Sequence, residues 1–433
     1  MSNFPSAALP TSDNIVAWIG LDWADRKHAV CLQATGSSRT ESLVVEQAPE
    51  ALHAWISELR RRFPTGQVAL ALEQCRGSLF YALMNYDFLL LYPVAPQAVA
   101  AYRKAFYPSG GKDDPVDAEL LLDLLLKHRD RLRPWKPDDV PTRQLRLLVE
   151  DRRQLVDDRT ALTNRLRDAL KIYFPQALEY LGDLSAPWNW AFLARWPTLS
   201  ALRRATRLQR EKFFRQHTRR SPEEVEALHQ QIRSARPLTS DPAVVETYQL
   251  LVQALVAQLQ ALAPALQRFE EAIQQLFATH PDQPIFQSFP GAGAVLAPRL
   301  LAAWGSDRER YTGADQMQRF SGIAPVLERS GKSHWVHWRL GCPKFLRQTF
   351  QEFAGQSRLH SPWARAYYQQ MRGRGLSHHS AVRALAFKWL RIMYRCWKNH
   401  VPYEESHYQH SLHRRGSPLC AALTLPPSRE VRS

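Results

Sequence analysis

Four carboxylate side chains in the first third of the chain have the types and positions that metal-ion binding requires. Asp22 ends an apolar, strand-like stretch, IVAWIGLD, and Glu73 ends a second one, VALALE. Asp114 and Asp117 are three residues apart in a helical segment, so their side chains face the same way. If the two strands are neighbours in one sheet, the four acids can converge on one point.

Carboxylates that converge in this way repel one another unless cations lie among them. Oxygen-only ligands suit Mg²⁺ or Mn²⁺, and two such ions about 4 Å apart can activate an attacking oxygen and stabilise a leaving one in phosphoryl transfer. Taken singly, each acid also has a structural explanation, as a turn cap, a solvated loop residue or a helix-start residue. Their order and placement together favour a metal site.

The elements that must position these acids follow from local patterns. Segments 15–21, 29–33 and 42–45 are typical of three successive strands, followed by a helix over 49–63 and apolar strands at 68–72 and 88–94. A further helix begins at Asp114, with Pro115 at its first position. The order βββαβαβα predicts an α/β domain whose mixed sheet is covered by helices.

The segment 133–142, RPWKPDDVPT, contains three prolines and predicts a domain boundary. Beyond it, leucines repeat every seven residues over 148–162, and a second long helix over 245–276 has apolar residues stepping by three and four. Two pairings of that helix remain open: a hairpin with segment 145–170, or self-association between chains. Pro264 lies inside it and predicts a kink.

The overall charge favours a polyanionic partner, above all nucleic acid. The chain has 57 Lys and Arg against 41 Asp and Glu, a formal net charge of +16, and a basic stretch occupies 203–220. The five cysteines lack the spacing of a zinc site or a disulfide framework. With no secretory pattern at the start and only short apolar runs, we expect a cytoplasmic protein without membrane spans.

Longer motifs resemble the IS one-ten family of DEDD transposases of bacterial insertion sequences, which are bridge-RNA-guided recombinases. The resemblance runs to about residue 405 and is carried by GLD at 20–22, LEQCRG at 72–77, GKDDPVDAELL at 111–121, FPGAGAVLAPRLLAAWG at 289–305 and FSGIAPVLERSGK at 320–332. It implies an RNase H-like (RuvC-like) domain at 13–132, a helical coiled-coil region at 143–280 and a mainly α transposase domain at 283–405. Residues 410–433 are expected to be a disordered tail.

The resemblance also implies roles for single residues. Asp22, Glu73, Asp114 and Asp117 would form the metal-binding tetrad for Mg²⁺ or Mn²⁺, and Ser330 would be the nucleophile of site-specific DNA strand exchange. Ser333 is a close rival for that role, and a serine before glycine is also a common turn residue. Family members bind donor and target DNA and a guide RNA, and act as dimers or tetramers that bring acids and serine together.

Around Ser330, cationic, histidine and indole side chains are mixed in a way that suits nucleic-acid backbones and bases. FPGAGAVLAPRL additionally resembles a helix-hairpin-helix, whose glycine turn can present backbone N–H groups to a phosphate. Trp338 belongs to the same mixture, although tryptophans there could equally be core residues. The nucleic-acid-binding candidates are Lys112, Lys332, His334, Trp335, His337, Arg339, Lys344 and Arg347.

Two departures from the family pattern affect these expectations. The usual glutamate-x-threonine-glycine is one residue longer here, EQCRG at 73–77, and the usual lysine-x-glycine after the serine is replaced by Leu340-Gly341-Cys342. Two other functions stay open: a RuvC-like junction resolvase or nuclease that needs no serine, and a non-catalytic nucleic-acid-binding protein.

Overall fold

The computed structural model describes residues 14–73, 77–106, 114–331 and 333–420. The chain divides into two compact units, Met1–Pro137 and Asp138–Ser433, and the division falls within the proline-rich segment 133–142. The first unit is a mixed α/β structure around a central sheet, whereas the second is mostly helical.

The sheet of the first unit has the strand order β3-β2-β1-β4-β5. Strands β1 to β3 form an antiparallel meander, and β4 and β5 continue the sheet parallel to β1. The strands are β1 (Ile15–Asp22), β2 (Lys27–Ala34), β3 (Thr40–Glu46), β4 (Gln67–Leu72) and β5 (Leu89–Pro93), and the helices are α1 (Pro49–Arg62), α2 (Ser78–Leu83), α3 (Pro96–Phe106) and α4 (Asp114–His128). The predicted strands and the helices at 49 and 114 are confirmed, while α3 was not foreseen.

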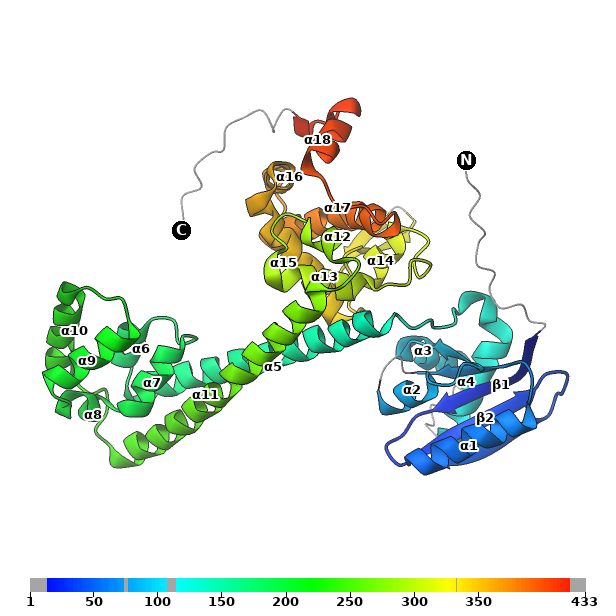
Figure 1. Ribbon diagram of the computed structural model, residues 1–433, viewed down its shortest axis with the longest axis horizontal. Helices are drawn as coiled ribbons and strands as arrows, with labels where there is room; N and C mark the ends of the chain where they lie inside the picture. Colours follow the sequence, from blue (N-terminus) through cyan, green and yellow to red (C-terminus); the bar gives the residue numbers. More distant parts are fainter. Residues whose placement is uncertain (1–13, 74–76, 107–113, 332, 421–433) are drawn as a thin grey trace. The chain divides into compact units, whose positions relative to one another are not determined.

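Side chains alternate between the two faces of this sheet, and each face has its own helices (Figure 1). Ile19 and Leu21 of β1 pack in the core formed with α1 and α2. Trp18 lies on the opposite face, against apolar residues of α4. Because successive side chains in a strand point to opposite faces, Gly20 and Asp22 share the α4 face with Trp18.

Helix α4 lies directly on β1 and runs in the opposite direction. A Cβ atom on Gly20 would come within 2.0 Å of the Ala118 carbonyl oxygen, so only glycine permits this approach. Beyond the carboxyl end of α4, the guanidinium of Arg129 stacks on Trp18, near the start of β1. The first turn of α4 therefore lies at the other end of β1, where Asp22 is.

The second unit contains two long helices, α5 (Val140–Tyr173) and α11 (Pro242–Ala278), which pack antiparallel along each other (Figure 1). Arg152 pairs with Glu270 towards one end, and Tyr173 stacks on Tyr248 towards the other. Of the two pairings that the sequence left open, the structure shows the hairpin within one chain. The helix α11 runs through Pro264 as a single element.

By length and apolar composition, α11 is the one described helix that could cross a membrane. Core helices of water-soluble proteins have the same composition, and α11 buries residues such as Val252, Leu259 and Ile273 against its neighbours in the unit. Packing inside the protein therefore covers only part of its apolar surface.

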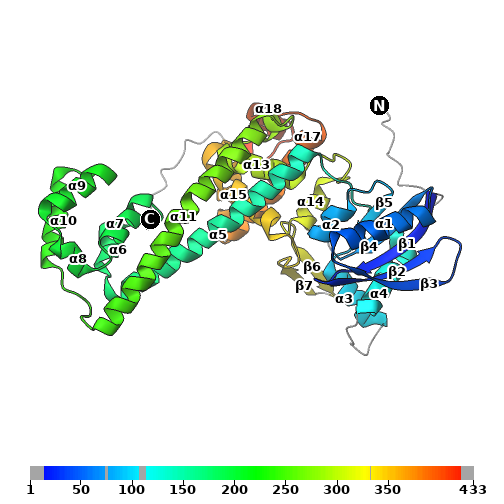
Figure 2. The ribbon, with the colours of Figure 1, turned by 60° about the horizontal axis from the view of Figure 1, so that its bottom comes forward.

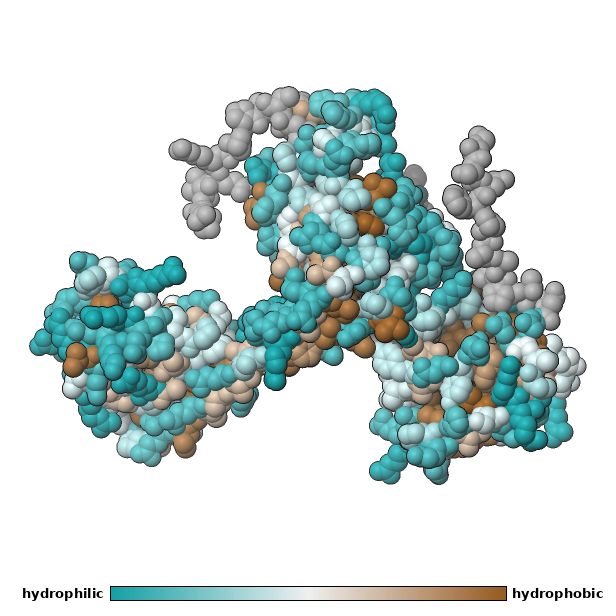
Figure 3. All heavy atoms as spheres, viewed as in Figure 1, coloured by the Kyte–Doolittle hydropathy of each residue, from teal (hydrophilic) through white to brown (hydrophobic). Residues whose placement is uncertain are grey.

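Between α5 and α11 the chain forms five helices around an aromatic core that includes Trp190, Phe192 and Phe213. The face of these helices that Figure 3 shows is mainly hydrophilic, with scattered hydrophobic side chains. The helices are α6 (Gln176–Leu181), α7 (Pro187–Arg195), α8 (Leu199–Arg204), α9 (Arg207–His217) and α10 (Pro222–Ser234).

The remaining residues of the second unit form a helical core that contains Trp304, Trp363, Trp389 and Trp397. A two-stranded antiparallel hairpin, β6–β7, projects from it (Figure 2) and was not predicted. The elements are α12 (Gln283–Gln287), α13 (Gly293–Trp304), α14 (Ala314–Phe320), β6 (Val326–Ser330), β7 (Ser333–His337), α15 (Lys344–His360), α16 (Pro362–Gly373), α17 (His378–Lys398) and α18 (Glu405–Arg414).

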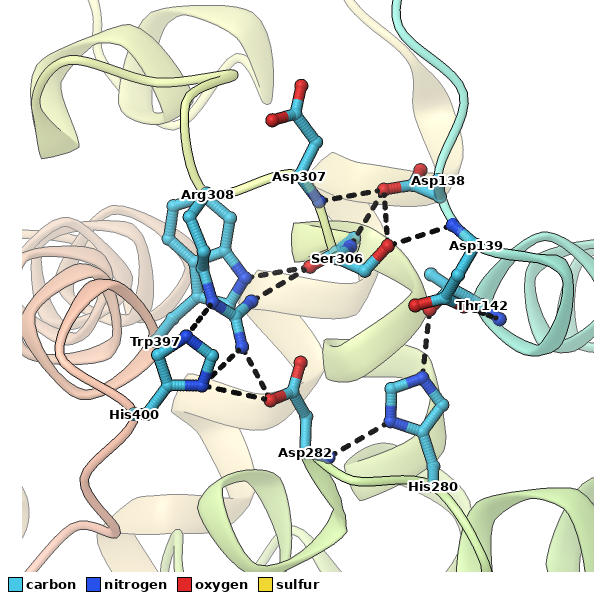
Figure 4. A network of polar contacts seen from close by, with 11 residues as sticks. Asp138, Asp139, Thr142, His280, Asp282, Ser306, Asp307, Arg308, Trp397 and His400 are labelled. Carbon is cyan, nitrogen blue, oxygen red and sulfur yellow. Dashed lines mark hydrogen bonds and ion pairs between the residues drawn. The ribbon is translucent and has the colours of Figure 1, made fainter. Parts of the chain in front are cut away.

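A polar network ties the start of α5 to this helical core (Figure 4). The buried Asp138 carboxylate accepts hydrogen bonds from the backbone N–H groups of Ser306 and Asp307, at 2.7 and 3.2 Å. Beside it, Arg308 pairs with the buried Asp282 at 2.5 Å. Because buried carboxylates require such partners, these contacts fix where the second unit begins.

The expected start of the disordered tail at residue 410 is too early. Helix α18 extends to Arg414, and Leu412 and Leu419 are buried. Apolar contacts of Leu412 with the helical core hold this segment in place, despite its polar composition. Residues 421–433 lie outside the described part of the chain.

Candidate active site

Asp22 and Glu73 lie side by side at the carboxyl edge of the sheet. Strands β1 and β4 are parallel neighbours, and Leu21 pairs with Leu72, so the next residue of each strand is an acid. Adjacent strands are about 4.8 Å apart. Ala71 of β4 packs on the α4 face, and Glu73 follows directly after the last residue of that strand. Both acids are half-buried.

Asp117 lies in the first turn of α4, at the same end of β1. Its side chain is buried and forms an ion pair with Arg103 of α3. Asp114 is the first residue of α4, but its side chain lies outside the described part of the structure. The sheet edge and the helix start thus bring Asp22, Glu73 and Asp117 to one end of the unit.

The donor set at this end fits a hard divalent cation in its chemistry, because it offers only carboxylate oxygens. Among the described residues, no group of three His, Cys, Asp or Glu side chains is gathered closely enough to hold a metal ion. The Arg103 guanidinium neutralises Asp117 in this structure, with Asp117 only 2% exposed. A cation bound here would therefore compete with Arg103 for that carboxylate.

His28 of β2 holds the loop that follows Asp22. Its Nδ1 accepts a hydrogen bond from the backbone N–H of Ala24 at 3.3 Å, and its Nε2 donates to the Gln47 side chain at 2.5 Å. Burial lowers the pKa of His28, which the bond to Gln47 partly offsets. The neutral ring fits both partners, whereas a protonated Nδ1 could not accept from Ala24.

Ser330 lies in the other unit, at the tip of the β6–β7 hairpin. It is the last residue of β6 and pairs across the turn with Ser333, and Gly331 follows with a φ of +56°. The Ser330 side chain is exposed and makes no hydrogen bond with any described residue. No base is therefore in place to activate the hydroxyl within the second unit as the structure describes it.

The two faces of the hairpin differ in chemistry. The strand register places Glu328, Trp335 and His337 on the face of Ser330, where His337 lies 3.3 Å from Glu328. The opposite face carries Leu327 and Val336, which are 61% and 67% exposed. The same face also carries Arg329 and His334, so the two apolar side chains lie beside basic ones.

The nucleic-acid-binding candidates that the structure describes all lie on or after this hairpin. His334, Trp335 and His337 are on β7, Arg339 follows it, and Lys344 and Arg347 occupy the first two turns of α15. The side chains of Arg339, Lys344 and Arg347 form no ion pair with any described acid. Lys112 and Lys332 fall outside the described residues.

The glycine-rich stretch 289–294 forms the turn between α12 and α13. Gly291 has a φ of +79°, and a Cβ there would come within 2.8 Å of the His360 ring of α15. The turn therefore packs against α15 on one side. Gly293 has a φ of +54° and open space around it, at the start of α13.

Family models match both ends of this arrangement. A model described as a transposase of the DEDD IS110 type matches residues 19–175, which include the sheet and its acids. A second, described as "Transposase IS116/IS110/IS902 family", matches residues 283–369, which include the β6–β7 hairpin. The chain belongs to the IS110 family of transposases. The family resemblance seen in the motifs of this transposase is thereby confirmed.

Several insertion-element proteins are similar to this transposase over most of its length. The "Mini-circle putative transposase for IS117" of Streptomyces coelicolor is 29% identical, covering 91% of this chain and 96% of the relative. A 42 kDa protein of IS900 from Mycobacterium paratuberculosis is 27% identical over 89% and 96%. A 44.8 kDa protein of IS116 from Streptomyces clavuligerus is 28% identical over 87% and 93%.

Sequence reasoning missed three side chains that shape these sites in this transposase. Arg103 pairs with Asp117, His28 holds the loop after Asp22, and Arg383 stacks on Trp338. Of the three, only His28 lies close in sequence to a predicted site residue, because it follows Asp22 by six residues. The other two are ordinary arginines on amphipathic helices, and only packing brings them to their partners.

Proposed function

We propose that this transposase carries out metal-dependent, site-specific strand exchange of insertion-sequence DNA through a covalent phosphoserine on Ser330. The observation that carries the proposal is the adjacency of Asp22 and Glu73 at the ends of β1 and β4, with Asp117 in the first turn of α4 at the same end. The strand order β3-β2-β1-β4-β5 supports an RNase H-like fold for this unit.

Asp22, Glu73, Asp114 and Asp117 would hold Mg²⁺ or Mn²⁺. When bound, the cation would neutralise charge that develops on the phosphate oxygens and lower the pKa of an attacking hydroxyl. The first turn of α4 adds the partial positive charge of a helix N-terminus, which stabilises the acids beside it. Arg103 would keep Asp117 paired while the site is empty of metal.

In the strand exchange, the Ser330 Oγ attacks the scissile phosphorus and forms a P–O bond. The serine proton passes to water, since no described base contacts the hydroxyl, and the leaving sugar oxygen takes up a proton. A sugar hydroxyl of the second strand then attacks the phosphoserine and releases Ser330 as a hydroxyl. The number of phosphodiester bonds is conserved, so no external energy source is needed.

Guidance by a bridge RNA and assembly into a dimer or tetramer complete the proposal. The family resemblance implies both, and the net charge of +16 suits binding of DNA and RNA together. The antiparallel pair of α5 and α11 is proposed to act as a coiled coil within such an assembly. Sequencing of copurified RNA and mass measurement in solution test these two points. A cytoplasmic, nucleoid-associated location follows from this activity.

The decisive experiment compares Ser330→Ala with Ser333→Ala, because the two serines face each other across the hairpin turn. DNA recombination and protein–DNA adducts that survive denaturation are both measured. We expect Ser330→Ala to lose adducts and at least about 10³-fold in rate, and Ser333→Ala to retain both. Asp22→Asn should lose both as well.

A nuclease or junction resolvase is the second candidate, and the absence of a described base beside Ser330 favours it. Two results together would establish this alternative: the Ser330→Ala variant still cleaves DNA, and the wild-type protein never retains DNA covalently. Retention of all function after replacement of the four acids would instead indicate a non-catalytic binding protein.

A further inference from the structure

Most of the excess positive charge of this transposase is concentrated around the hairpin and the helices that follow it. Residues 329–403 contain fourteen Lys and Arg but only one acid, Glu352. That acid is already engaged, because it pairs with Arg299 and Arg153. The lysines and arginines of this segment therefore have almost no acidic residue within the same segment as a partner.

Arg383 of α17 is the most exceptional of these cations. Its guanidinium carbon lies over the Trp338 ring, 3.3 Å from the ring centroid, so the cation contacts the face of the indole. Its Nε and Nη2 atoms are buried and have no hydrogen-bond partner. Among the described arginines, no other has two such nitrogen atoms. A buried donor without a partner is costly, and an anionic oxygen that accepted from it would remove that cost.

Arg347 lies close enough to act on the same guanidinium. Helices α15 and α17 pack together, and burial, followed by the charge of Arg347, lowers the pKa of Arg383. The next cation along the chain from Trp338, Arg339, also has a buried Nε without a partner. Cations that lie close together without an acid repel one another, and an anion bound between them would turn this repulsion into attraction.

We infer that Arg383 and Arg347 form a phosphate clamp beside Trp338, which binds the phosphodiester backbone of the nucleic-acid strand presented to Ser330. The planar guanidinium suits a phosphate because it can donate two parallel hydrogen bonds. Trp338 is 50% exposed although Arg383 covers one face of its ring, so the other face is open to a nucleobase. The inference rests on the proposed function for the identity of the strand.

Equilibrium binding of 20-nucleotide single strands of DNA and of RNA tests the clamp without requiring catalysis. We measure the affinity of the full-length Arg383→Gln variant over a range of salt concentrations. A lost phosphate contact should weaken binding about 10- to 100-fold and reduce the slope of log affinity against log salt by about one. The DNA and RNA arms show which strand the clamp prefers.

Three further variants separate the clamp from other roles of the same residues. Arg268→Gln removes one exposed charge from α11 and should leave affinity and slope within error. Trp338→Leu should weaken binding without changing the slope, since stacking involves no counterion release. Arg383→Lys should retain the slope but lose part of the affinity, because the planar fork is gone.

An unchanged slope in Arg383→Gln, with a loss no larger than that of Trp338→Leu, would show that Arg383 only supports the tryptophan and would overturn the clamp. If Arg383→Gln does not fold, Arg347→Gln takes its place with the same expected slope change. Because binding is measured without chemistry, a nucleolytic or inactive Ser330 would leave this result unaffected.

Discussion

The carboxylate site and the serine hairpin differ in how much of the surrounding protein packs against them. Asp22 and Glu73 extend from the central strands of a sheet that is covered on both faces, and α4 lies on β1 at van der Waals contact through Gly20. Ser330 is held mainly by the backbone ladder of a two-stranded hairpin, whose side chains are nearly all exposed. Isolated two-stranded hairpins are marginally stable in water.

This contrast has a physical meaning for an enzyme that acts on DNA. A cluster of carboxylates must be pre-organised, since the fold has to overcome their mutual repulsion before a cation arrives. A nucleophile that must reach a scissile phosphate gains from an exposed position, and bound nucleic acid can supply the missing order. The following predictions test the contrast, from the largest expected effect to the smallest.

Adding a side chain to the glycine beneath α4 should affect the first unit far more than the same change at the hairpin. Gly20→Leu should cost at least about 3 kcal/mol of unfolding free energy, because α4 must move away from β1. At Gly331 a Cβ atom would meet no other atom, and only the left-handed φ disfavours a side chain. Gly331→Ala should therefore cost about 1–2 kcal/mol of stability, and only within the hairpin. Thermal unfolding and limited proteolysis measure both, and equal effects would contradict the contrast.

Removing the partner of Asp117 should make the stability of the protein depend on metal. Arg103→Ala leaves a buried carboxylate without its cation and should cost about 3 kcal/mol. Mg²⁺ should restore much of this loss, because it would occupy the place of the guanidinium. Arg61→Ala breaks an exposed pair with Glu58 and is the control with almost no effect. A loss in Arg103→Ala that Mg²⁺ does not change would contradict metal binding at Asp117.

Acidification should loosen the loop after Asp22 through His28. Burial lowers the pKa of His28 below its unfolded value of 6.5, so protons bind more tightly to the unfolded chain. The stabilisation from neutral His28 is therefore present above pH 6.5 and lost as the pH falls below it. Melting temperatures between pH 7.5 and 5.5 should decrease less in His28→Gln than in wild type, by a few degrees. Parallel pH profiles would show that His28 contributes nothing.

Polar replacement of the uncovered hairpin face should have the smallest effect on stability. Leu327→Asn and Val336→Thr change side chains that are more than half exposed, so unfolding free energies should stay within about 0.5 kcal/mol of wild type. Thermal unfolding of the two variants provides the measurement. A loss of 2 kcal/mol or more would mean that this face is packed within the folded protein.

Much of the first unit could be predicted because its signals are local. Apolar runs of strand length ending in Asp22 and Glu73 were recognisable, and so was the helix start at Asp114 with Pro115. The hairpin at 326–337 was missed because neither face is buried, which leaves no alternation of apolar and polar residues to recognise. The expected tail failed at Leu412, whose apolar contacts with the helical core outweigh a polar composition.

The basic residues show the same limit. The stretch 203–220 was prominent as a charge run, but the fold uses much of it internally: Arg207 pairs with Glu211 and Glu226, and Arg210 and Arg220 donate to backbone carbonyls. Arg383 was inconspicuous in an amphipathic helix, yet it has unpartnered buried nitrogen atoms. Charge density along the chain does not reveal which cations are already neutralised.

The sequence alone determined that carboxylates would end two strands and begin a helix. The apolar periodicity of a strand and the residues that start a helix are both set by neighbours in the chain. The sequence also determined the basic excess and, through its motifs, the family. Only the tertiary structure decided that Asp22 and Glu73 follow paired residues of neighbouring strands, that Arg103 reaches Asp117, and that Arg383 meets Trp338. Those pairings arise from packing between segments far apart in the chain, which local periodicity cannot specify.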